Sequence, residues 1–556
     1  MYVFRDGRRT ISGAELLSEL CRALNPCAHA PEDNLLTALI AAGELECALA
    51  DDNSCADSCQ LAASITDEIA SAFLLGEMHS LSSILLRAGQ IRVAGIYQAS
   101  VQEGFAYYAL HPRKVAMLLD TLTLAPRMAV LGIRSIGATL SAVACAALRQ
   151  RGIECSRTSV RPTGHPYGRA LELTPELRHW IADAGDAGFL ILDEGPGISG
   201  SSFLAVAERL VECGVSCDRI QMIGSREVDP ATLRAENAHA RWRRFRFHVM
   251  QNAPLVPAGA GESLSGGTWR RYFPCDECTM PATWPTLEVA KFLTLDGASL
   301  FKFEGLGHYG AAVGARAQLL AENGFSPRYL GNRNGFGLYK LVSGRMLTAR
   351  DLSPKFLERM AEYLAFRAAN FAASAQQSPE LEKMLCWNWQ TEFGEELSPD
   401  ESHLSAIRVV TCDARMMPHE WLCIEQGELL KLDAVSHGDN HFFPGPCDIA
   451  WDVAGAIIEW EMPPETRSWF VRLYEERSGD SVAGRLPPYL LAYAAFRMGW
   501  SSMAALSSHG EYDEALLLRD YRRYREAALH LRCGEDSTIS NRTQQSPQPP
   551  CAAPLR

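Results

Sequence analysis

Two carboxylates followed by a run of small residues stand near the middle of this 556-residue chain. Residues 189–192 are four consecutive apolar residues, which is typical of a short strand buried in a parallel sheet. Asp193 and Glu194 follow where that strand would end, and a glycine- and serine-rich loop leads into a helical run at 203–214. Backbone N–H groups at a helix start bind anions, whereas the two carboxylates suit sugar hydroxyls or hydrated magnesium. The stretch therefore predicts a site for a phosphorylated sugar. The alternative is an ordinary strand–loop–helix turn.

This combination resembles the phosphoribosyl pyrophosphate (PRPP) motif of type I phosphoribosyltransferases, with four apolar residues, two acids and a loop ending in Ser-Gly-Ser. The resemblance implies that Asp193 and Glu194 hold the ribose diol and that Asp193 also faces a Mg²⁺ ion. The loop residues that it assigns to the 5′-phosphate are Gly197, Ser199, Gly200, Ser201 and Ser202. The loop is slightly longer than the family's, and Gly197 stands where the family often has an acid or a threonine.

Two further loops bring basic residues to the same predicted site. Loop 132–137 follows an apolar strand, and the resemblance makes Arg134 and Ser135 ligands of the pyrophosphate, because a guanidinium fork matches phosphate oxygens. The turn-rich segment 160–169 stands where the family often has a mobile loop over the reacting centre. The side chains in it expected to stabilise the departing pyrophosphate are Arg161, His165 and Arg169. The alternatives are a surface arginine in a turn and a solvated loop.

A lysine in an alternating apolar strand begins a second group of residues. Lys302 is followed by Gly305 and Gly307 and then by a helical run. Farther along, two strands each end in an acid, Asp413 and Asp433, which stand 20 positions apart (433 − 413). This spacing resembles that of the two aspartates of kinase-like phosphotransferases, in which a hairpin brings both carboxylates to one metal–phosphate site.

The order of strand lysine, helix, strands and a Leu-Val-Ser-Gly-Arg connector resembles the small lobe of the kinase-like fold of aminoglycoside and choline phosphotransferases. The resemblance implies that Lys302 and the two glycines bind the phosphates of ATP. It also implies that Asp413 orients the acceptor hydroxyl and that Asp433 carries Mg²⁺. The family's metal-binding asparagine is replaced by Pro418 and His419. His419 is therefore the substitute ligand, although magnesium prefers oxygen.

The sequence His-Gly-Asp-Asn-His at 437–441 offers a rival, with Asp439 as the catalytic acid. We prefer the pair at 413 and 433, because too few residues separate Asp439 from the next acids to form a hairpin. The alternating side chains of His437, Asp439 and His441 also allow a metal site on one strand face. Polar loop residues beside a phosphate site are the plainer alternative.

Hydrophobic periodicity places these motifs in an α/β multidomain protein. The fold class expected is a helical N-terminal region, a doubly wound parallel-sheet domain like the phosphoribosyltransferases, and a two-lobed α+β kinase-like domain. The expected boundaries are 1–100 for the helical region, 101–252 for the parallel-sheet domain, 253–289 for a connector, 290–533 for the kinase-like domain and 534–556 for a disordered tail.

Composition favours a cytoplasmic protein. A net charge of −13 argues against general nucleic-acid binding, because phosphate contacts need a basic surface. No apolar run reaches the ~18 residues that span a bilayer, and no apolar leader is present, so neither a membrane nor export is expected. The 17 cysteines are scattered, which is typical of reduced thiols. Cys275 and Cys278 form a lone pair without the second pair that zinc needs.

The sequence therefore predicts a bifunctional transferase that uses PRPP and ATP as substrates, Mg²⁺ as cofactor and small molecules as acceptors, with homo-oligomer formation left open. The alternative is a non-catalytic protein that senses PRPP or nucleotide, or a scaffold, built from degenerate copies of both folds. Both motifs depart from their family pattern at a catalytic position, which is what favours this alternative.

Overall fold

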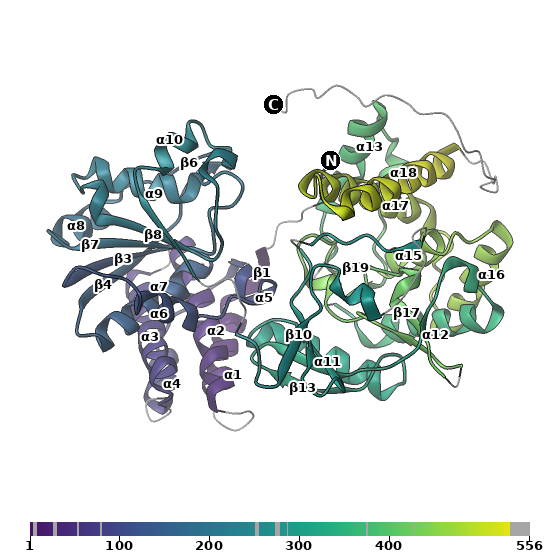
Figure 1. Ribbon diagram of the computed structural model, residues 1–556, viewed down its shortest axis with the longest axis horizontal. Helices are drawn as coiled ribbons and strands as arrows, with labels where there is room; N and C mark the ends of the chain where they lie inside the picture. Colours follow the sequence, from purple (N-terminus) through teal and green to yellow (C-terminus); the bar gives the residue numbers. More distant parts are fainter. Residues whose placement is uncertain are drawn as a thin grey trace.

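The structure is a computed structural model that describes residues 1–3, 8–25, 31–52, 55–77, 81–250, 255–272, 279–285, 287–373, 376–425 and 427–533. The predicted tail at 534–556, together with Cys275 and Cys278, lies outside these residues. The chain forms two halves that lie side by side, with residues 8–250 in one and residues 1–3 together with the described residues from 255 onward in the other (Figure 1). Among the described residues, no helix is long and apolar enough to cross a membrane.

A five-stranded parallel sheet forms the centre of the first half (Figure 1). Its strands lie in the order β4-β3-β7-β8-β9, and every neighbouring pair is parallel, as predicted. The strands are β3 (Arg127–Ile133), β4 (Glu154–Val160), β7 (Gly188–Leu192), β8 (Ile220–Gly224) and β9 (Arg246–Val249). The strand order reverses at β3 and β7, and in such sheets the carboxyl ends at the reversal form the ligand crevice.

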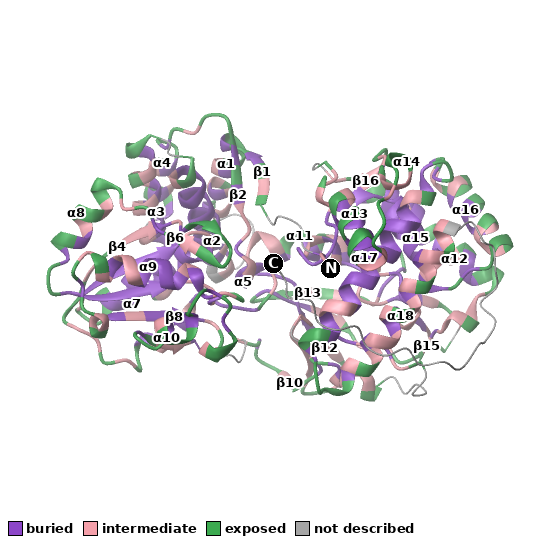
Figure 2. Cartoon of the chain, turned by 90° about the horizontal axis from the view of Figure 1, so that it is seen from above, coloured by how far each residue is buried: buried purple, intermediate pink, exposed green. Residues whose placement is uncertain are grey.

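Helices cover both faces of this sheet because side chains alternate along each strand. Met128 and Val130 of β3 join the core made with α2, α3 and α7, whereas Ala129 and Leu131 join the core on the opposite face. The helices are α1 (Gly13–Leu24), α2 (Pro31–Asp51), α3 (Ala56–Leu75), α4 (Leu81–Ala88), α5 (Glu103–Ala106), α6 (Arg113–Leu119), α7 (Ile136–Gln150), α8 (Pro175–Asp183), α9 (Ser201–Glu212) and α10 (Ala238–Trp242). Buried segments run through the centre of this half in Figure 2.

The N-terminal helices are part of this domain rather than a separate region. α2 and α3 share one hydrophobic core with α7 and the parallel sheet. A short antiparallel pair, β1 (Arg8–Ser12) with β2 (Ile96–Ser100), closes the helical segment onto itself. The boundary expected at residue 100 therefore does not separate two cores, because helices distant in sequence bury their apolar faces against the sheet.

The second half begins with a five-stranded antiparallel sheet in the order β10-β11-β12-β14-β13. Its strands are β10 (Ala260–Ser263), β11 (Lys291–Thr294), β12 (Ser299–Phe303), β13 (Tyr329–Arg333) and β14 (Phe336–Lys340), and α11 (His308–Glu322) lies between β12 and β13 in sequence. Lys302 of β12 is opposite Lys291 of β11 and Gly337 of β14. β10 belongs to this sheet, so the segment expected to be a connector contributes a strand and then runs on through a 3₁₀ turn at Thr268–Tyr272.

A helical lobe follows and carries two small antiparallel sheets, one of three strands and one of two. The helices are α12 (Pro354–Asn370), α13 (Glu380–Phe393), α14 (Pro399–Ser402), α15 (Ala450–Glu459), α16 (Pro464–Ser478), α17 (Leu486–Ser507) and α18 (Tyr512–Cys533). The short strands are β15 (Arg345–Met346), β16 (Val409–Val410), β17 (Trp421–Cys423), β18 (Leu429–Lys431) and β19 (Cys447–Asp448). Tyr2 and Asn388 exchange hydrogen bonds of 2.5 and 2.8 Å, so the N-terminal end of the chain packs in this lobe.

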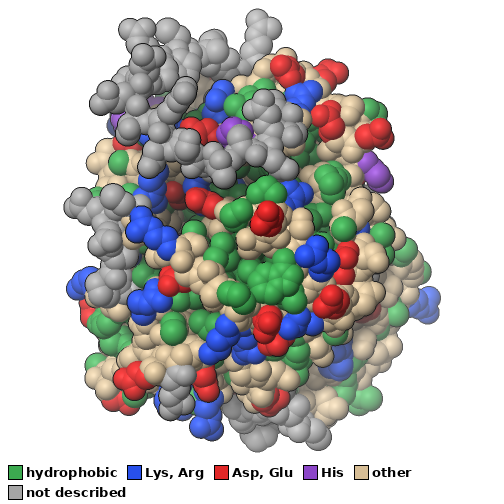
Figure 3. All heavy atoms as spheres, turned by 90° about the vertical axis from the view of Figure 1, so that its right-hand side faces the viewer, with side chains coloured by type: hydrophobic (Ala, Val, Ile, Leu, Met, Phe, Trp, Pro, Cys, Tyr) green, Lys and Arg blue, Asp and Glu red, His purple; other side chains and the backbone are tan. Residues whose placement is uncertain are grey.

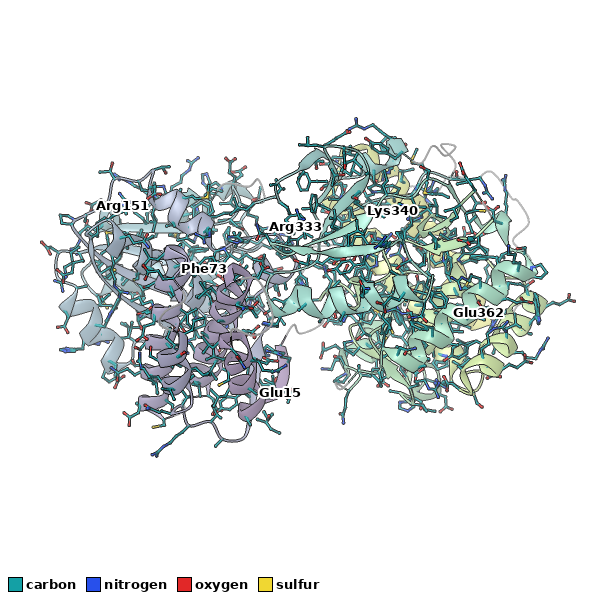
Figure 4. All side chains as sticks on the ribbon, turned by 90° about the horizontal axis from the view of Figure 1, so that it is seen from below. Glu15, Phe73, Arg151, Arg333, Lys340 and Glu362 are labelled. Carbon is teal, nitrogen blue, oxygen red and sulfur yellow. The ribbon has the colours of Figure 1, made fainter. Side chains whose placement is uncertain are left out.

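The turn between β12 and α11 fixes the two halves to each other. The Leu306 N–H donates to the Phe105 carbonyl at 2.9 Å, and Tyr309 donates to the buried carboxylate of Glu44 on α2. In Figure 4 the sheet that carries Arg333 and Lys340 lies between the first half and the helical lobe. The small sheet is thus held from both sides.

Gly305 and Gly307, expected to bind ATP, are instead packed into this junction. A Cβ on Gly305 would lie 3.2 Å from the Ala106 carbonyl oxygen, and one on Gly307 would lie 3.2 Å from the Cα of Thr37. Both glycines also have positive φ angles, 110° and 57°. Glycine stands here because two backbones approach closely, and neither residue lines the cavity described next.

Candidate functional site

A cavity of about 1200 Å³ lies between the small sheet, the helical lobe and the edge of the first half. Apolar side chains in its wall include Leu264, Leu293, Leu300, Val342 and Met346. The wall also contains Lys302, Asp433 and their charged neighbours, which form the polar end of the cavity. A large, mostly apolar pocket with a few convergent charged groups is the usual form of a small-molecule site.

Lys302 and Asp433 form an ion pair at the polar end of the cavity. The Lys302 Nζ also donates to the Ser436 hydroxyl at 2.8 Å, and Lys291 Nζ lies 3.4 Å from the second oxygen of Asp433. Burial alone would raise the pKa of Asp433, but the two ammonium groups outweigh it and hold the pKa well below its ordinary value. Asp433 is therefore a permanent anion between two cations. The sequence analysis named Lys302 and Asp433 as separate site residues, but it predicted neither their ion pair nor the presence of Lys291.

Asp413 lies beneath the cavity and is not part of its wall. Its side chain is 1% exposed, accepts a hydrogen bond from Tyr363, and lies 3.3 Å from the ammonium of Lys431. Asp452 of α15 accepts hydrogen bonds from the backbone N–H groups of Asp413 and Ala414, which fixes the loop. In this structure a substrate hydroxyl has no direct path to Asp413, so its predicted role as the nucleophile-orienting acid would have to act through Lys431.

Lys431 connects Asp413 to an acid that does face the cavity. Its Nζ donates to Glu420 at 2.9 Å, and the side chain is completely buried. Burial would lower the pKa of Lys431, but Asp413 and Glu420 outweigh it and raise the pKa. Arg415 lies 3.1 Å from the other oxygen of Glu420. The sequence analysis did not identify Glu420 or Lys431, because a strand pattern does not show that a lysine is buried against two acids.

His419 lines the cavity but stacks on Trp269, with ring centroids 6.0 Å apart and planes inclined by 14°. Burial and several nearby cations lower its pKa well below the ordinary value. Among the described residues, the donors that lie within 4.8 Å of one another around Asp433 come from Glu420 and His437, and not from His419. The predicted substitute ligand thus lies apart from the acids.

The rival acid, Asp439, is held by α11. Arg316 of α11 forms an ion pair with the Asp439 carboxylate and donates to the Val435 carbonyl at 3.0 and 3.1 Å. Tyr107 from the first half donates to the Asp439 carbonyl at 2.8 Å. His441 lies 3.8 Å from Glu103, also in the first half. His437, Asp439 and His441 therefore do not converge on one point, and the metal site considered for them is not formed.

In the first half, Asp193 and Glu194 lie half-buried at the carboxyl end of β7. Burial raises the pKa of Asp193 to about 7, and burial together with Glu103 raises the pKa of Glu194 to about 8. The Gly104 N–H at the start of α5 is a hydrogen-bond donor to Glu194 and opposes that rise. Two neighbouring carboxylates with raised pKa values at the reversal of the strand order are a functional signal, although Glu194 also has this structural partner.

The loop predicted to bind phosphate is covered by a hairpin, β5 (Thr163–His165) with β6 (Gly168–Ala170). Ser199 and Ser201 both donate to the Pro166 carbonyl, at 2.8 and 2.7 Å. Gly200 takes the left-handed conformation before α9, Ser202 lies in its first turn, and Gly197 is exposed. The serine hydroxyls thus already have an acceptor in this structure.

The basic residues predicted for pyrophosphate are turned toward α2. Arg134 donates to Asp51 at 2.9 Å, and Arg161 forms an ion pair with the same carboxylate. Ser135 has a φ of 112° and donates to the Val101 carbonyl at 3.1 Å. His165 is exposed at the hairpin and contacts the Tyr167 ring. Arg134 and Arg161 are therefore neighbours, as expected, but both form ion pairs with Asp51.

No protein-family model matches the chain, and no curated protein matches it. Solved structures similar to part of it include a choline/ethanolamine kinase family protein from Mesorhizobium loti, 14% identical, covering 43% of this chain and 84% of its own, with a TM-score of 0.32. Choline kinase LicA from Streptococcus pneumoniae is 13% identical over 43% of this chain and 89% of its own, with a TM-score of 0.30. Macrolide 2′-phosphotransferase MphH from Brachybacterium faecium is 15% identical over 48% and 97%, with a TM-score of 0.28.

TM-scores this low do not support a conclusion about the function of this chain. The phosphoribosyltransferase resemblance finds no support in these comparisons.

Proposed function

We propose that the second half transfers a phosphoryl group from a nucleoside triphosphate to a hydroxyl of a small molecule. The observation that carries this proposal is the Lys302–Asp433 ion pair in the wall of a cavity whose lining is mostly apolar. The lysine comes from the small sheet and the acid from the helical lobe, so the pair lies where a ligand would contact both lobes.

The wall of the cavity suits both parts of a nucleotide. A planar base would pack against the apolar side chains of the wall, which also includes Leu341 and Val342 of the connector. The triphosphate would then reach Lys302 and Lys291, whose charges offset those of the phosphates. Phosphoryl transfer needs mainly positioning and charge stabilisation, so charge stabilisation by these two lysines would be the chain's main contribution to the reaction. Asp433 would hold the divalent ion that the reaction uses.

Titration calorimetry with ATP tests this proposal. Lys302→Met should weaken ATP binding by about 10- to 100-fold, which corresponds to about 1.5–3 kcal/mol for a hydrogen bond to a charged group. Lys355→Met is the matched control, because Lys355 is an exposed lysine of α12 whose Nζ donates to the Gly427 carbonyl at 3.0 Å, away from the cavity wall. Equal ATP affinity in the two variants would refute the proposal. A screen for ADP formation with hydroxyl-bearing small molecules then identifies the acceptor.

A second function is proposed for the first half: binding of PRPP, and phosphoribosyl transfer from it. What supports it is the pair of acids at the reversal point of a doubly wound sheet, together with the positive φ of Ser135 in the neighbouring loop. PRPP would have to displace Pro166 from Ser199 and Ser201. Calorimetry with PRPP tests this, and an absence of PRPP binding would also exclude PRPP sensing and leave only nucleotide sensing or a scaffold role for this half.

On the face shown in Figure 3, Lys and Arg side chains are interspersed with Asp and Glu. This mixed surface is in keeping with the proposal of small-molecule substrates rather than nucleic acid.

A further inference from the structure

Three metal-ligating side chains converge at the polar end of the cavity, and they come from three separate turns. Glu420 ends the 3₁₀ turn before β17, Asp433 follows β18, and His437 begins the 3₁₀ turn after it. One donor atom from each lies within 4.8 Å of the others. All three line the cavity, so an ion between them would also face a bound ligand.

His437 makes this cluster more than a group of acids. Its Nε2 lies 3.6 Å from Asp433, and its Nδ1 is buried with no hydrogen-bond partner among the described residues. The ring contacts Phe443 at a centroid distance of 5.3 Å, which holds it on the cavity side of the turn. A buried imidazole nitrogen without a partner is costly unless a ligand completes it.

We propose that Glu420, Asp433 and His437 bind a divalent transition-metal ion such as Mn²⁺, in preference to Mg²⁺, when a nucleotide is bound. This inference rests on the proposed phosphoryl transfer and specifies its metal. Magnesium takes oxygen ligands almost exclusively, whereas imidazole suits first-row transition metals. The set of one nitrogen and two carboxylates therefore selects a softer ion than an all-oxygen set would.

The charges around the cluster explain why the nucleotide is needed. In this structure, cations hold both carboxylates: Lys291 and Lys302 contact Asp433, and Arg415 and Lys431 contact Glu420. These four positive charges repel a bare metal ion. A triphosphate that engages Lys302 and Lys291 adds negative charge and releases the oxygens of Asp433. Metal binding should therefore follow nucleotide binding.

The histidine predicted from the sequence gives a matched control. His419 also lines the cavity, but it stacks on Trp269 and does not belong to the donor cluster. Replacing His419 removes an imidazole of the same size from the same cavity without removing a ligand. His437→Ala and His419→Ala therefore separate metal ligation from general effects on the cavity.

The test measures Mn²⁺ binding to the full chain by the electron paramagnetic resonance signal of the free ion, with and without ADP. With ADP, His437→Ala should bind Mn²⁺ at least about tenfold more weakly than the wild type, because even residues that only orient a metal ligand are worth about 10- to 100-fold. His419→Ala should match the wild type. His437→Asp should bind Mg²⁺ better relative to Mn²⁺, because its ligands are then all oxygen.

A control measurement makes every outcome decisive: ADP affinity measured in EDTA shows whether each variant keeps an intact cavity. If the wild type does not bind ADP in EDTA or with metal, the proposed phosphoryl transfer fails and this inference with it. If ADP binds but Mn²⁺ affinity is the same in the wild type and His437→Ala, only the metal assignment is overturned. A loss of Mn²⁺ affinity in His419→Ala alone also overturns it.

Discussion

Replacing Lys431, a buried lysine of the second half, tests directly how the site is built. Lys431 is completely buried between Glu420 and Asp413, at 2.9 and 3.3 Å. Lys431→Met keeps most of the volume but leaves two buried carboxylates without this cation. Breaking a buried ion pair costs about 3–5 kcal/mol. The lost hydrogen bond to Glu420 accounts for about 1.5–3 kcal/mol of this cost, and the lost ion pair with Asp413 adds to it.

Thermal unfolding of the full chain measures this cost. For a domain of this size, about 1 kcal/mol shifts Tm by about 2–4 °C, so Lys431→Met should lower the Tm of the second half by roughly 10 °C. The exposed lysine variant Lys355→Met should shift it little. Adding Asp413→Asn to Lys431→Met should restore part of the loss, because one uncompensated charge is then removed. A shift for Lys431→Met no larger than for Lys355→Met would refute the buried network as described.

Three further predictions concern the remaining contacts. Glu194→Gln should raise Tm more at pH 9 than at pH 5. The pKa of Glu194 is about 8 in the folded protein and 4.5 in the unfolded chain, so the stability that the protonated Glu194 contributes below pH 4.5 is lost as pH rises through 8; a pH-independent difference would contradict this. Gly307→Ala should destabilise the junction of the halves by about 1–3 kcal/mol and increase hydrogen exchange there. The control is Gly297→Ala, which has a similar φ of 68° but lies in open space, and it should leave hydrogen exchange at the junction unchanged. Arg316→Gln should increase hydrogen exchange at residues 435–439, and unchanged protection would show that α11 does not hold that loop.

The sequence predicted elements whose signal is local. The apolar runs before loop 132–137 and before Asp193 are parallel strands, as their length and flanking turns indicated. Lys302 lies in β12 and Asp433 directly follows β18, which the apolar runs before them indicated, but their contact joins residues 131 positions apart and was not predicted. The functional roles assigned to them remain predictions.

The sequence could not show partners that are far apart along the chain. Arg134 and Arg161 meet Asp51, which is 83 and 110 positions away, so a basic residue that resembles a phosphate ligand is instead in an ion pair. Glycines after a strand lysine suggested a phosphate loop, but Gly305 and Gly307 allow two domains to approach closely. The burial of Asp413 depends on Lys431 and on packing that no local pattern encodes.

A crystal structure with a non-hydrolysable ATP analogue tests the central claim most directly. The account predicts the triphosphate within hydrogen-bonding distance of Lys302, with Asp433 released from it, and the base among the apolar residues that include Leu264 and Met346. A nucleotide bound elsewhere, with the Lys302–Asp433 pair intact, would contradict the account.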